Sequence, residues 1–355
     1  MDKKAYIILE NGKIFEGKSV GYESECVGEL VFTTAMTGYI ETLTDPSYYG
    51  QIVLQTFPLI GNYGMIPEDF ESRKPFLSGY VVREVCEHPS NFRCKGKLRD
   101  FLIENKIPAI CGVDTRALTR IVRENGVMNA KISFDNKMPK DLKDYKIVNA
   151  VKSVTEGTGI REIGGEGTKI IVWDFGVKGN IERELIKRGC KVFVASAGCT
   201  AEEILAENPE GLVLSNGPGD PAENTEIIKE LKKLVEKRLP IMGICLGHQL
   251  LALANGAETK KIKYGHRGAN QPALYKKTGK VFVTSQNHGY AVVGETLPSY
   301  AKESFVNGND GTCEGVDYID RPAFSVQFHP EASAGPHDTS FLFDEFLKMV
   351  KGGCR

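Results

Sequence analysis

Hydrophobic and polar positions follow two different patterns along the chain, and the second half has the more regular one. Its apolar runs are short and nearly uninterrupted, as in buried strands, and they lie at 169–175, 190–196, 211–216, 240–245, 280–288 and 323–329. Other segments carry apolar residues at helical spacing, at 180–189, 200–209, 222–238, 246–256 and 338–353. Strands that alternate with amphipathic helices predict an α/β fold with a mostly parallel, doubly wound sheet, covered on both faces.

The first half mixes strand-like and helical patterns without such a repeat. Alternating runs flank the Asn11-Gly12 pair, which favours a β-hairpin with a type I′ turn. Residues 96–106 and 114–124 have helical apolar spacing, and Asp114 suits the N-cap of the second helix. These elements indicate a smaller mixed α/β domain.

A glycine-rich stretch separates the two patterns. Residues 151–168 contain five glycines and no sustained periodicity, which is typical of a linker. A chain of 355 residues is also longer than most single hydrophobic cores. The sequence therefore predicts an N-terminal domain at 1–150, a linker at 151–168 and a second domain at 169–355.

The composition is that of an ordinary globular chain, and it argues against several classes of protein. Lysine and arginine total 45 while aspartate and glutamate total 46, so we expect no broad nucleic-acid-binding face. No apolar run approaches the ~20 residues that span a bilayer, and we expect no signal peptide. The nine cysteines lack C-x-x-C or zinc spacing, so we expect reduced thiols, no metal site and a cytoplasmic location.

The stretch LPIMGICLGHQLLALANG contains the most informative residue, Cys245. It falls between a predicted strand and a predicted helix, with Gly243 and Gly247 on either side, which is the spacing of a nucleophile elbow. Glycine at both positions leaves room for the crossing backbone. The N–H groups that begin the helix favour a thiolate, and the N–H of Leu246 can donate to an oxyanion. The alternative is a buried structural cysteine, and the spacing favours the nucleophile.

A cysteine nucleophile needs a general base, and His329 is the best candidate among six histidines. It ends a predicted strand in His329-Pro330-Glu331, where an extended backbone points residues i and i+2 to the same side. Glu331 can therefore orient the imidazole. His248 lies on the elbow itself and suits a structural role. His266 lies in a glycine-rich loop, and the sequence indicates no carboxylate partner for it.

Two further segments, at 212–221 and 285–292, each contain the end of a predicted strand. Both combine glycines with polar neighbours, so their backbone N–H groups suit a bound anion or carbonyl. Because ligands bind beyond the carboxyl ends of parallel strands, we expect both segments at the same edge as Cys245. The residues concerned are Gly217, Gly219, Asn287, Gly289 and Tyr290.

Four of these segments, GICLGHQLLA, SNGPGDP, SQNHGYAV and FHPEAS, together resemble the class I glutamine amidotransferase family. The segments FTTAMTGYIETLTDPSYYGQIV, GVDTRALTRIVRENG and VWDFGVKGNIERELIKRG are similar to the family of carbamoyl-phosphate synthase small subunits. The resemblance covers nearly the whole chain. It implies that Cys245 attacks the side-chain amide of glutamine, that His329 protonates the departing ammonia, and that Glu331 orients His329. A γ-glutamyl thioester would then be hydrolysed by water.

The resemblance also implies substrate-binding residues, a partner and a pathway. The oxyanion and the amino-acid end of glutamine would contact Ser47, Gly217, Gly219, Leu246, Gln249, Asn287, Gly289 and Tyr290. Ser47 is carried over from the family alone. The N-terminal domain would contact a large synthetase subunit, which would hold ATP and a metal ion and use bicarbonate, so no cofactor is expected in this chain. The product would serve arginine or pyrimidine synthesis.

Three alternatives remain open at this point. The chain could be the glutaminase of another synthase, a γ-glutamyl hydrolase of the same fold, or an inactive scaffold subunit. The N-terminal segment TAMTGYIETLTDPS argues against the first two. The intact set of Cys245, His329 and Glu331 argues against the third.

Overall fold

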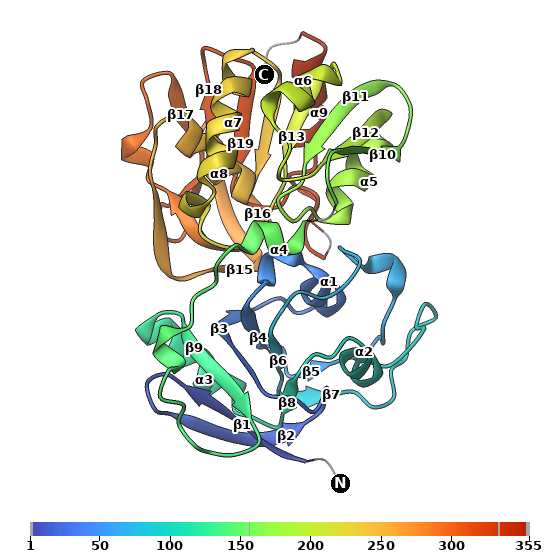
Figure 1. The fold of residues 1–355 in the computed structure, drawn as a ribbon, viewed down its shortest axis with the longest axis vertical. Helices are drawn as coiled ribbons and strands as arrows, with labels where there is room; N and C mark the ends of the chain where they lie inside the picture. Colours follow the sequence, from blue (N-terminus) through green and yellow to red (C-terminus); the bar gives the residue numbers. More distant parts are fainter. Residues whose placement is uncertain (1–2, 156, 333, 353–355) are drawn as a thin grey trace. The chain divides into compact units, whose positions relative to one another are not determined.

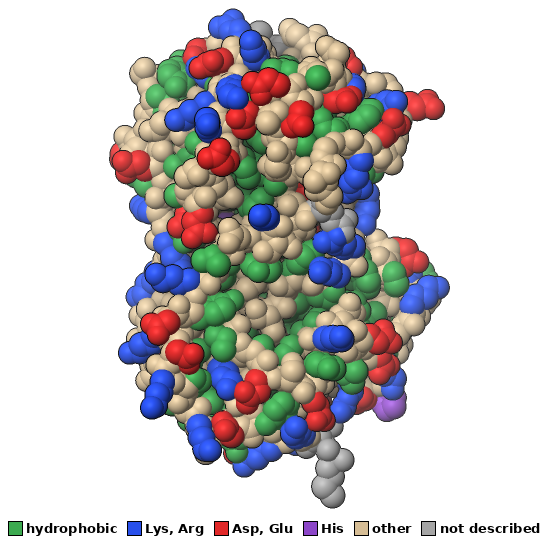
Figure 2. All heavy atoms as spheres, in the orientation of Figure 1, with side chains coloured by type: hydrophobic (Ala, Val, Ile, Leu, Met, Phe, Trp, Pro, Cys, Tyr) green, Lys and Arg blue, Asp and Glu red, His purple; other side chains and the backbone are tan. Residues whose placement is uncertain are grey.

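The structure is a computed structural model that describes residues 3–155, 157–332 and 334–352. The chain divides into two compact units, Met1–Ala150 and Val151–Arg355 (Figure 1). No helix within the described ranges is both long and apolar enough to cross a membrane. Acidic and basic side chains are interspersed over the visible surface of each unit (Figure 2), in keeping with the balanced composition.

The N-terminal unit is built on a closed barrel with the strand order β1-β2-β8-β6-β4-β3-β9. Its strands are β1 (Lys4–Leu9), β2 (Ile14–Ser19), β3 (Cys26–Thr33), β4 (Gln51–Gln55), β6 (Gly79–Val81), β8 (Ala109–Cys111) and β9 (Met128–Ser133). Successive strand residues point to opposite faces. Val31 and Val53 therefore pack with two helices, α1 (Tyr39–Thr44) and α2 (Leu98–Glu104). Leu30 and Ile52 pack instead with α3 (Thr115–Asn125).

Smaller elements complete this unit. They are the paired strands β5 (Leu59–Ile60) and β7 (Glu84–Val85), with the 3-10 turns η1 (Pro46–Tyr48), η2 (Pro67–Asp69) and η3 (Leu142–Asp144). The two helices predicted from the sequence form as α2 and α3. Asp114 caps α3 as predicted, because its carboxylate accepts the N–H of Ala117 at 2.9 Å.

The N-terminal hairpin forms as predicted, but its turn is not of type I′. β1 and β2 pair antiparallel, with Ile8 opposite Ile14. The N–H of Gly12 donates to the carbonyl of Leu9, and the N–H of Leu9 donates to the carbonyl of Lys13, both at 2.9 Å. Among the loop residues between the two strands, Gly12 alone has a positive φ, +88°. A type I′ turn needs two such residues, so a turn with one left-handed glycine replaces it.

The C-terminal unit contains, within its described residues, a sheet in the order β10-β12-β11-β13-β14-β19-β18-β16-β15-β17. Its strands are β10 (Ile160–Gly164), β11 (Thr168–Trp173), β12 (Cys190–Ala195), β13 (Gly211–Leu214), β14 (Ile241–Ile244), β15 (Thr259–Tyr275), β16 (Lys280–Val292), β17 (Ala301–Asn307), β18 (Cys313–Tyr318) and β19 (Ala323–Val326). The central strands β12, β11, β13, β14 and β19 are parallel, whereas the outer strands pair antiparallel. The predicted α/β fold class is confirmed.

Helices cover both faces of this sheet, as the alternating pattern predicts. On one face, Leu212 of β13 packs with α4 (Ala150–Val154), α6 (Ala201–Ala206), α7 (Thr225–Glu236) and α8 (Leu246–Ala254). Figure 1 shows α7 and α8 lying across this face. On the other face, Val213 packs with α5 (Gly179–Lys187) and α9 (Phe341–Val350). The 3-10 turns η4 (Pro221–Glu223) and η5 (Gly294–Thr296) lie in connecting loops.

The stretch 151–168, predicted to be a linker, contains regular structure in its described residues. It holds most of α4 and the edge strand β10, which pairs antiparallel with β12. Its glycines serve close packing as well as turning, because a Cβ on Gly165 would lie 2.0 Å from the carbonyl oxygen of Cys190. Glycine content alone therefore does not distinguish a free linker from a tightly packed sheet edge.

Candidate active site

Cys245 lies between β14 and α8, at the carboxyl end of a central parallel strand. Its backbone has φ 54° and ψ −104°, which L-residues rarely adopt. A Cβ on Gly247 would lie 2.3 Å from the carbonyl oxygen of Leu214, and one on Gly243 would lie 2.8 Å from that of Gly247. Both positions need glycine because the backbones pass so closely. The elbow stores strain of about 1–3 kcal/mol, held in place in part by the Cys245 N–H bond to Val326.

The sulfur of Cys245 faces residues from β16 and from the segment that follows β19. The side chain is 2% exposed, and Sγ lies 3.7 Å from the carbonyl oxygen of Asn287 in β16. The thiol also lies close enough to His329 to contribute to the raised pKa of that histidine. The buried Nε2 of His329 makes no hydrogen bond to the described residues. Cys245, Asn287 and His329 therefore share one site.

His329 follows β19 and is fixed from both sides. Its N–H donates to the carbonyl of Ser285 at 2.9 Å, and its Nδ1 lies 2.6 Å from Oε1 of Glu331. Both side chains are almost completely buried. Burial alone would lower the pKa of His329, but the Glu331 carboxylate and the thiol outweigh it and raise the pKa to about 10. The imidazole therefore carries its second proton at neutral pH.

Lys178, which the sequence analysis does not single out, also contacts this pair. It precedes α5, and its Nζ lies 3.2 Å from Oε1 of Glu331, although 153 residues separate the two in sequence. Burial would raise the pKa of Glu331, but His329 and Lys178 lower it to about 2. The carboxylate is therefore ionised between two cations. The sequence feature that could have identified Lys178 is its position: it lies shortly after a central strand, as Cys245 does.

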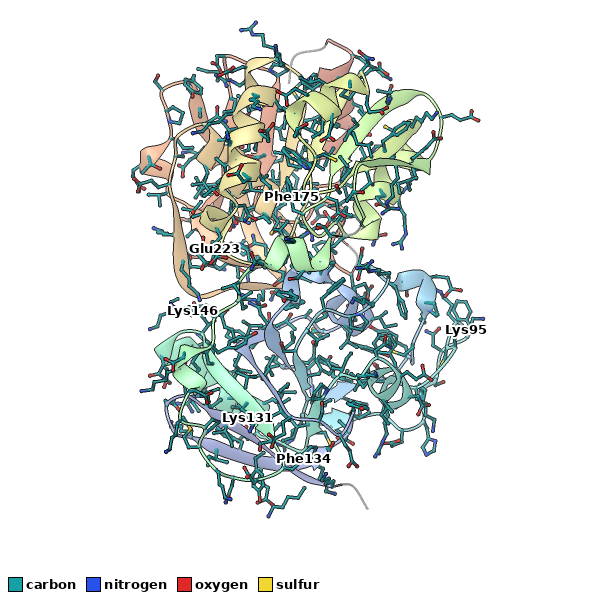
Figure 3. All side chains as sticks on the ribbon, viewed as in Figure 1. Lys95, Lys131, Phe134, Lys146, Phe175 and Glu223 are labelled. Carbon is teal, nitrogen blue, oxygen red and sulfur yellow. The ribbon has the colours of Figure 1, made fainter. Side chains whose placement is uncertain are left out.

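The loop that carries Lys178 is bound to the loop after β13. The side chain of Asn216 accepts the Lys178 N–H at 3.0 Å and donates to the carbonyl of Gly176 at 2.9 Å. Phe175, labelled in Figure 3, donates its N–H to Oγ of Ser215 at 2.8 Å. These side chains hold the two loops against each other at the carboxyl edge of the sheet.

The predicted residues Gly217 and Leu246 lie at the same edge. A Cβ on Gly217 would lie 2.2 Å from the carbonyl oxygen of Phe175 and 2.8 Å from Cδ2 of Leu246. Gly217 must therefore be glycine for the loop after β13 to approach the elbow. Gly219, two residues on, has a left-handed φ of +88°.

The remaining predicted ligands of the C-terminal unit lie on α8 and β16. Nε2 of Gln249 donates to the carbonyl of Tyr290 at 2.9 Å and to Oε1 of Gln327, also at 2.9 Å. Asn287, Gly289 and Tyr290 all lie inside β16, because this strand does not end near residue 288 as predicted but runs on to Val292 in antiparallel pairing with β15. Asn287 still reaches Cys245 through its backbone carbonyl.

Ser47 belongs to the N-terminal unit. It lies in η1, where its N–H donates to Oδ1 of Asp45 at 2.9 Å, and the residue is buried. Its contact with glutamine stays a prediction.

Two other histidines have defined partners. His248 is buried, with Nδ1 2.8 Å from Oγ of Ser325, and burial lowers its pKa to about 3, which fits a structural role. The expectation that His266 lacks a carboxylate partner is wrong. Its Nε2 lies 3.0 Å from Asp310 and its Nδ1 lies 3.4 Å from Glu314. Pairing among β15, β17 and β18 brings together residues that lie 44 or more positions apart.

One group of buried side chains has residue types that could hold a metal ion. His266, His288 and Glu314 each offer a ligand atom within 4.8 Å of the others. All three side chains also make hydrogen bonds to neighbouring residues.

Comparison with known proteins extends the resemblance seen in the sequence. Residues 7–132 match the family described as carbamoyl-phosphate synthase small chain, CPSase domain, and residues 171–349 match glutamine amidotransferase class-I. A carbamoyl phosphate synthase small chain of Clostridium perfringens is 53% identical over 98% of this chain and 99% of that protein. Those of Bacillus cereus and Listeria monocytogenes are 49% and 47% identical, over 98% of this chain and 96% and 97% of those proteins.

The two matched regions fall in the two units of the structure, and the identities extend over nearly the whole length. The chain thus belongs to the family of carbamoyl phosphate synthase small chains, the glutamine-hydrolysing subunits of that enzyme.

Proposed function

We propose that this chain hydrolyses glutamine at Cys245 and passes the ammonia to a large synthetase subunit, which makes carbamoyl phosphate from bicarbonate and ATP in the cytoplasm. One observation carries the assignment of the site: a strained, buried cysteine lies beside a histidine that Glu331 holds in its protonated form. Such a pair combines a nucleophile with a proton donor for the leaving group.

The reaction begins when the thiolate of Cys245, beside the protonated His329, attacks the side-chain amide carbon of glutamine. The carbonyl oxygen gains the negative charge, which the N–H groups of Leu246 and Gly217 stabilise. The carbon–nitrogen bond then breaks, and His329 gives its proton to the leaving nitrogen, which departs as ammonia. A γ-glutamyl thioester on Cys245 remains.

Water completes the cycle. His329, now neutral, takes a proton from a water molecule that attacks the thioester carbon. The carbon–sulfur bond breaks, glutamate leaves, and the sulfur returns to its starting state beside a protonated His329. Glu331 keeps the imidazole oriented in both steps, because its Oε1 lies 2.6 Å from Nδ1.

The remaining predicted residues bind the amino-acid end of the substrate. Gln249 is held by two hydrogen bonds and lies beside the backbone of Tyr290. We assign the same role to Gly219, Asn287 and Gly289, and to Ser47 from the N-terminal unit. The chain itself would need no cofactor, while ATP and a metal ion would bind the large subunit. Ammonia must stay unprotonated in transit, so we expect a sheltered path between the subunits.

Replacement of Cys245 by serine tests this function in the complex with the large subunit. Glutamine-dependent carbamoyl phosphate synthesis should fall by about 10³-fold or more, because the hydroxyl is a far weaker nucleophile. Synthesis from added ammonia should stay within about twofold of wild type, because added ammonia replaces the product of glutamine hydrolysis and the remaining steps do not use Cys245.

Cys199→Ser is a matched control. Its sulfur is buried in the same unit and lies 3.5 Å from Oγ of Ser196, so serine can keep that contact. This variant should retain both activities. Glutamine-dependent synthesis by Cys245→Ser at the wild-type rate would exclude the proposed nucleophile, and an inactive wild-type complex would favour the scaffold alternative.

A further inference from the structure

We propose that Glu314 is a positioning residue for glutamine binding, acting through Gln286 and His288 on the strand segment 287–290. This inference rests on the proposed function, because that segment supplies Asn287, Gly289 and Tyr290 to the substrate site. Glu314 itself lies in β18 and touches none of the reacting atoms in the scheme above.

Glu314 is a buried carboxylate with a full set of partners. It is 0% exposed, and its Oε1 accepts a hydrogen bond from Nδ2 of Asn307 at 3.0 Å. Its Oε2 accepts one from Nε2 of Gln286 at 3.0 Å, and Nδ1 of His266 lies 3.4 Å from Oε1. A buried charge is costly unless such partners compensate it. This arrangement therefore holds three side chains from three other strands in place.

The amide of Gln286 has a fixed orientation. Its Nε2 lies 3.1 Å from Oγ1 of Thr284, and that hydroxyl already donates its hydrogen to the carbonyl of Gln271. The hydroxyl oxygen can therefore only accept from Gln286. Glu314, which accepts the second hydrogen of the same amide, reinforces this orientation. The carbonyl oxygen of Gln286 must then point toward His288, whose Nε2 lies 3.1 Å away.

His288 connects this network to Tyr290. Its Nδ1 lies 2.8 Å from the carbonyl oxygen of Tyr290, while its Nε2 faces Gln286. Both neighbours are acceptors, and a neutral imidazole can donate from only one nitrogen at a time. The carbonyl oxygens of Gln286 and Tyr290 therefore compete for that one hydrogen, and the orientation of Gln286 helps to decide which nitrogen of His288 carries it. Glu314, by holding the amide of Gln286, acts on this choice.

The geometry of β16 carries this effect to the active site. Alternate residues of a strand point to opposite faces. Gln286 and His288 are buried on one face, whereas the alternate residues Asn287 and Gly289 are only half-buried. The carbonyl of Asn287 lies 3.7 Å from the Cys245 sulfur, and Gln249 donates to the same Tyr290 carbonyl that His288 contacts. The network therefore holds in place the segment 287–290 of β16, whose backbone faces the nucleophile.

His266 and Asp310 form the outer end of the network. His266 lies between the two carboxylates, and its ring packs edge-on against that of His288 with centroids 4.9 Å apart. Burial lowers the pKa of His266, but its bonds to Glu314 and Asp310 outweigh burial and raise it. Asp310 is much less buried than Glu314 and accepts the N–H and hydroxyl of Thr312. The network thus runs from the surface to the substrate segment.

The test is the substitution Glu314→Gln, measured as glutamine hydrolysis by the complex with the large subunit. The added NH₂ group must face a donor, either Asn307 or Gln286, so the amide of Gln286 loses its fixed orientation. We expect KM for glutamine to rise about tenfold, the effect of one lost charge-assisted hydrogen bond. The kcat should stay within about twofold, because Cys245, His329 and Glu331 keep their contacts.

Glu303→Gln is the matched control, since Glu303 lies on the neighbouring strand β17 and pairs with Lys276 at 3.2 Å near the surface. It should leave KM unchanged. Covalent labelling of Cys245 adds a second readout. A glutamine-mimicking chloroketone should label Glu314→Gln only at higher concentration, whereas iodoacetamide should label it at the wild-type rate, because iodoacetamide does not need the substrate site.

Each outcome decides between the hypotheses. A wild-type KM and wild-type chloroketone labelling in Glu314→Gln would overturn the positioning role while leaving the proposed function intact. Wild-type protein that the chloroketone does not label would instead count against the proposed function. If Glu314→Gln loses iodoacetamide labelling through misfolding, Asp310→Asn replaces it and should raise KM about threefold. An unchanged KM there, or a tightly bound metal ion found by elemental analysis, would overturn the network.

Discussion

The two units of the chain bury polar side chains in different ways. In the N-terminal barrel, Tyr63 accepts the N–H groups of Gly38 and Tyr39 at 2.9 and 3.2 Å, and Tyr39 donates to the carbonyl of Gly64. Burial raises the pKa of both tyrosines, so they stay neutral. In the C-terminal sheet, the buried polar groups include ionised ones, such as His329, Glu331 and Lys178.

The difference shows what each kind of buried polarity does. A neutral hydroxyl that binds the backbone satisfies donors at low desolvation cost and fixes a loop or a helix start. A buried ion pair costs far more to desolvate and adds little stability. Charges are kept in an interior where a reaction needs a proton or a nucleophile in a set state. Removal of a charge should therefore change catalysis, and removal of a hydroxyl should change stability.

Of the substitutions that test this difference, Glu331→Gln should reduce catalysis most. A small effect would contradict the distinction drawn between the buried charges of one unit and the buried hydroxyls of the other. Without the carboxylate, burial lowers the pKa of His329 from about 10 back toward or below its ordinary 6.5. His329 would then lose its proton at neutral pH, and kcat for glutamine hydrolysis should fall about 10²-fold. The alkaline limb of the pH–rate profile should move down in pH. Glu162→Gln, at an exposed ion pair with Lys191, should change neither.

His329 and Glu331 should make the free energy of unfolding depend on pH in both the alkaline and the acidic range. The pKa of His329 is raised in the folded state, so its contribution is complete below pH 6.5 and is lost as the pH rises through about 10. The pKa of Glu331 is depressed, so its contribution is complete above pH 4.5 and is lost as the pH falls through about 2. In Glu331→Gln, denaturant unfolding should lose both dependences. An unchanged alkaline loss would mean that another group causes it.

Lys178→Met should reduce catalysis less than Glu331→Gln does, and it tests whether each buried charge has its own effect on His329. It removes one cation from Glu331 but leaves the hydrogen bond to His329, so we expect kcat/KM to fall about tenfold. Because Lys178 lowers the pKa of His329, the alkaline limb should move up in pH, opposite to its movement in Glu331→Gln. Lys187→Met is the control, since Lys187 lies on the following helix with a 75% exposed side chain. A downward movement of the limb would contradict the proposed charge balance.

Tyr63→Phe should have the smallest effect on catalysis. It keeps the ring stacked on Tyr39 but leaves two N–H groups at the start of α1 without their acceptor. The free energy of unfolding should fall by about 1–2 kcal/mol, and kcat should stay within about twofold of wild type. Tyr22→Phe, at a 39% exposed site in the same unit, should leave both unchanged. A large loss of kcat without loss of stability would show that this tyrosine is not merely structural.

Much of the fold and part of the candidate site could be predicted from local sequence. The alternation of apolar runs with amphipathic helices predicts the parallel centre of the C-terminal sheet. The glycines around Cys245 predict an elbow because close backbone crossing excludes a Cβ there. The spacing of His329 and Glu331 places both side chains on one side of an extended segment. Each of these inferences concerns residues within a few positions of one another, where backbone geometry alone decides direction.

The tertiary structure alone decided which distant groups meet. Lys178 reaches Glu331 across 153 residues, and His266 finds Asp310 and Glu314 only because antiparallel strands pair beside the parallel core. Periodicity says which face of an element is apolar, but it does not say which partner a buried charge will have. That choice follows from strand order and register, which depend on the packing of the whole unit.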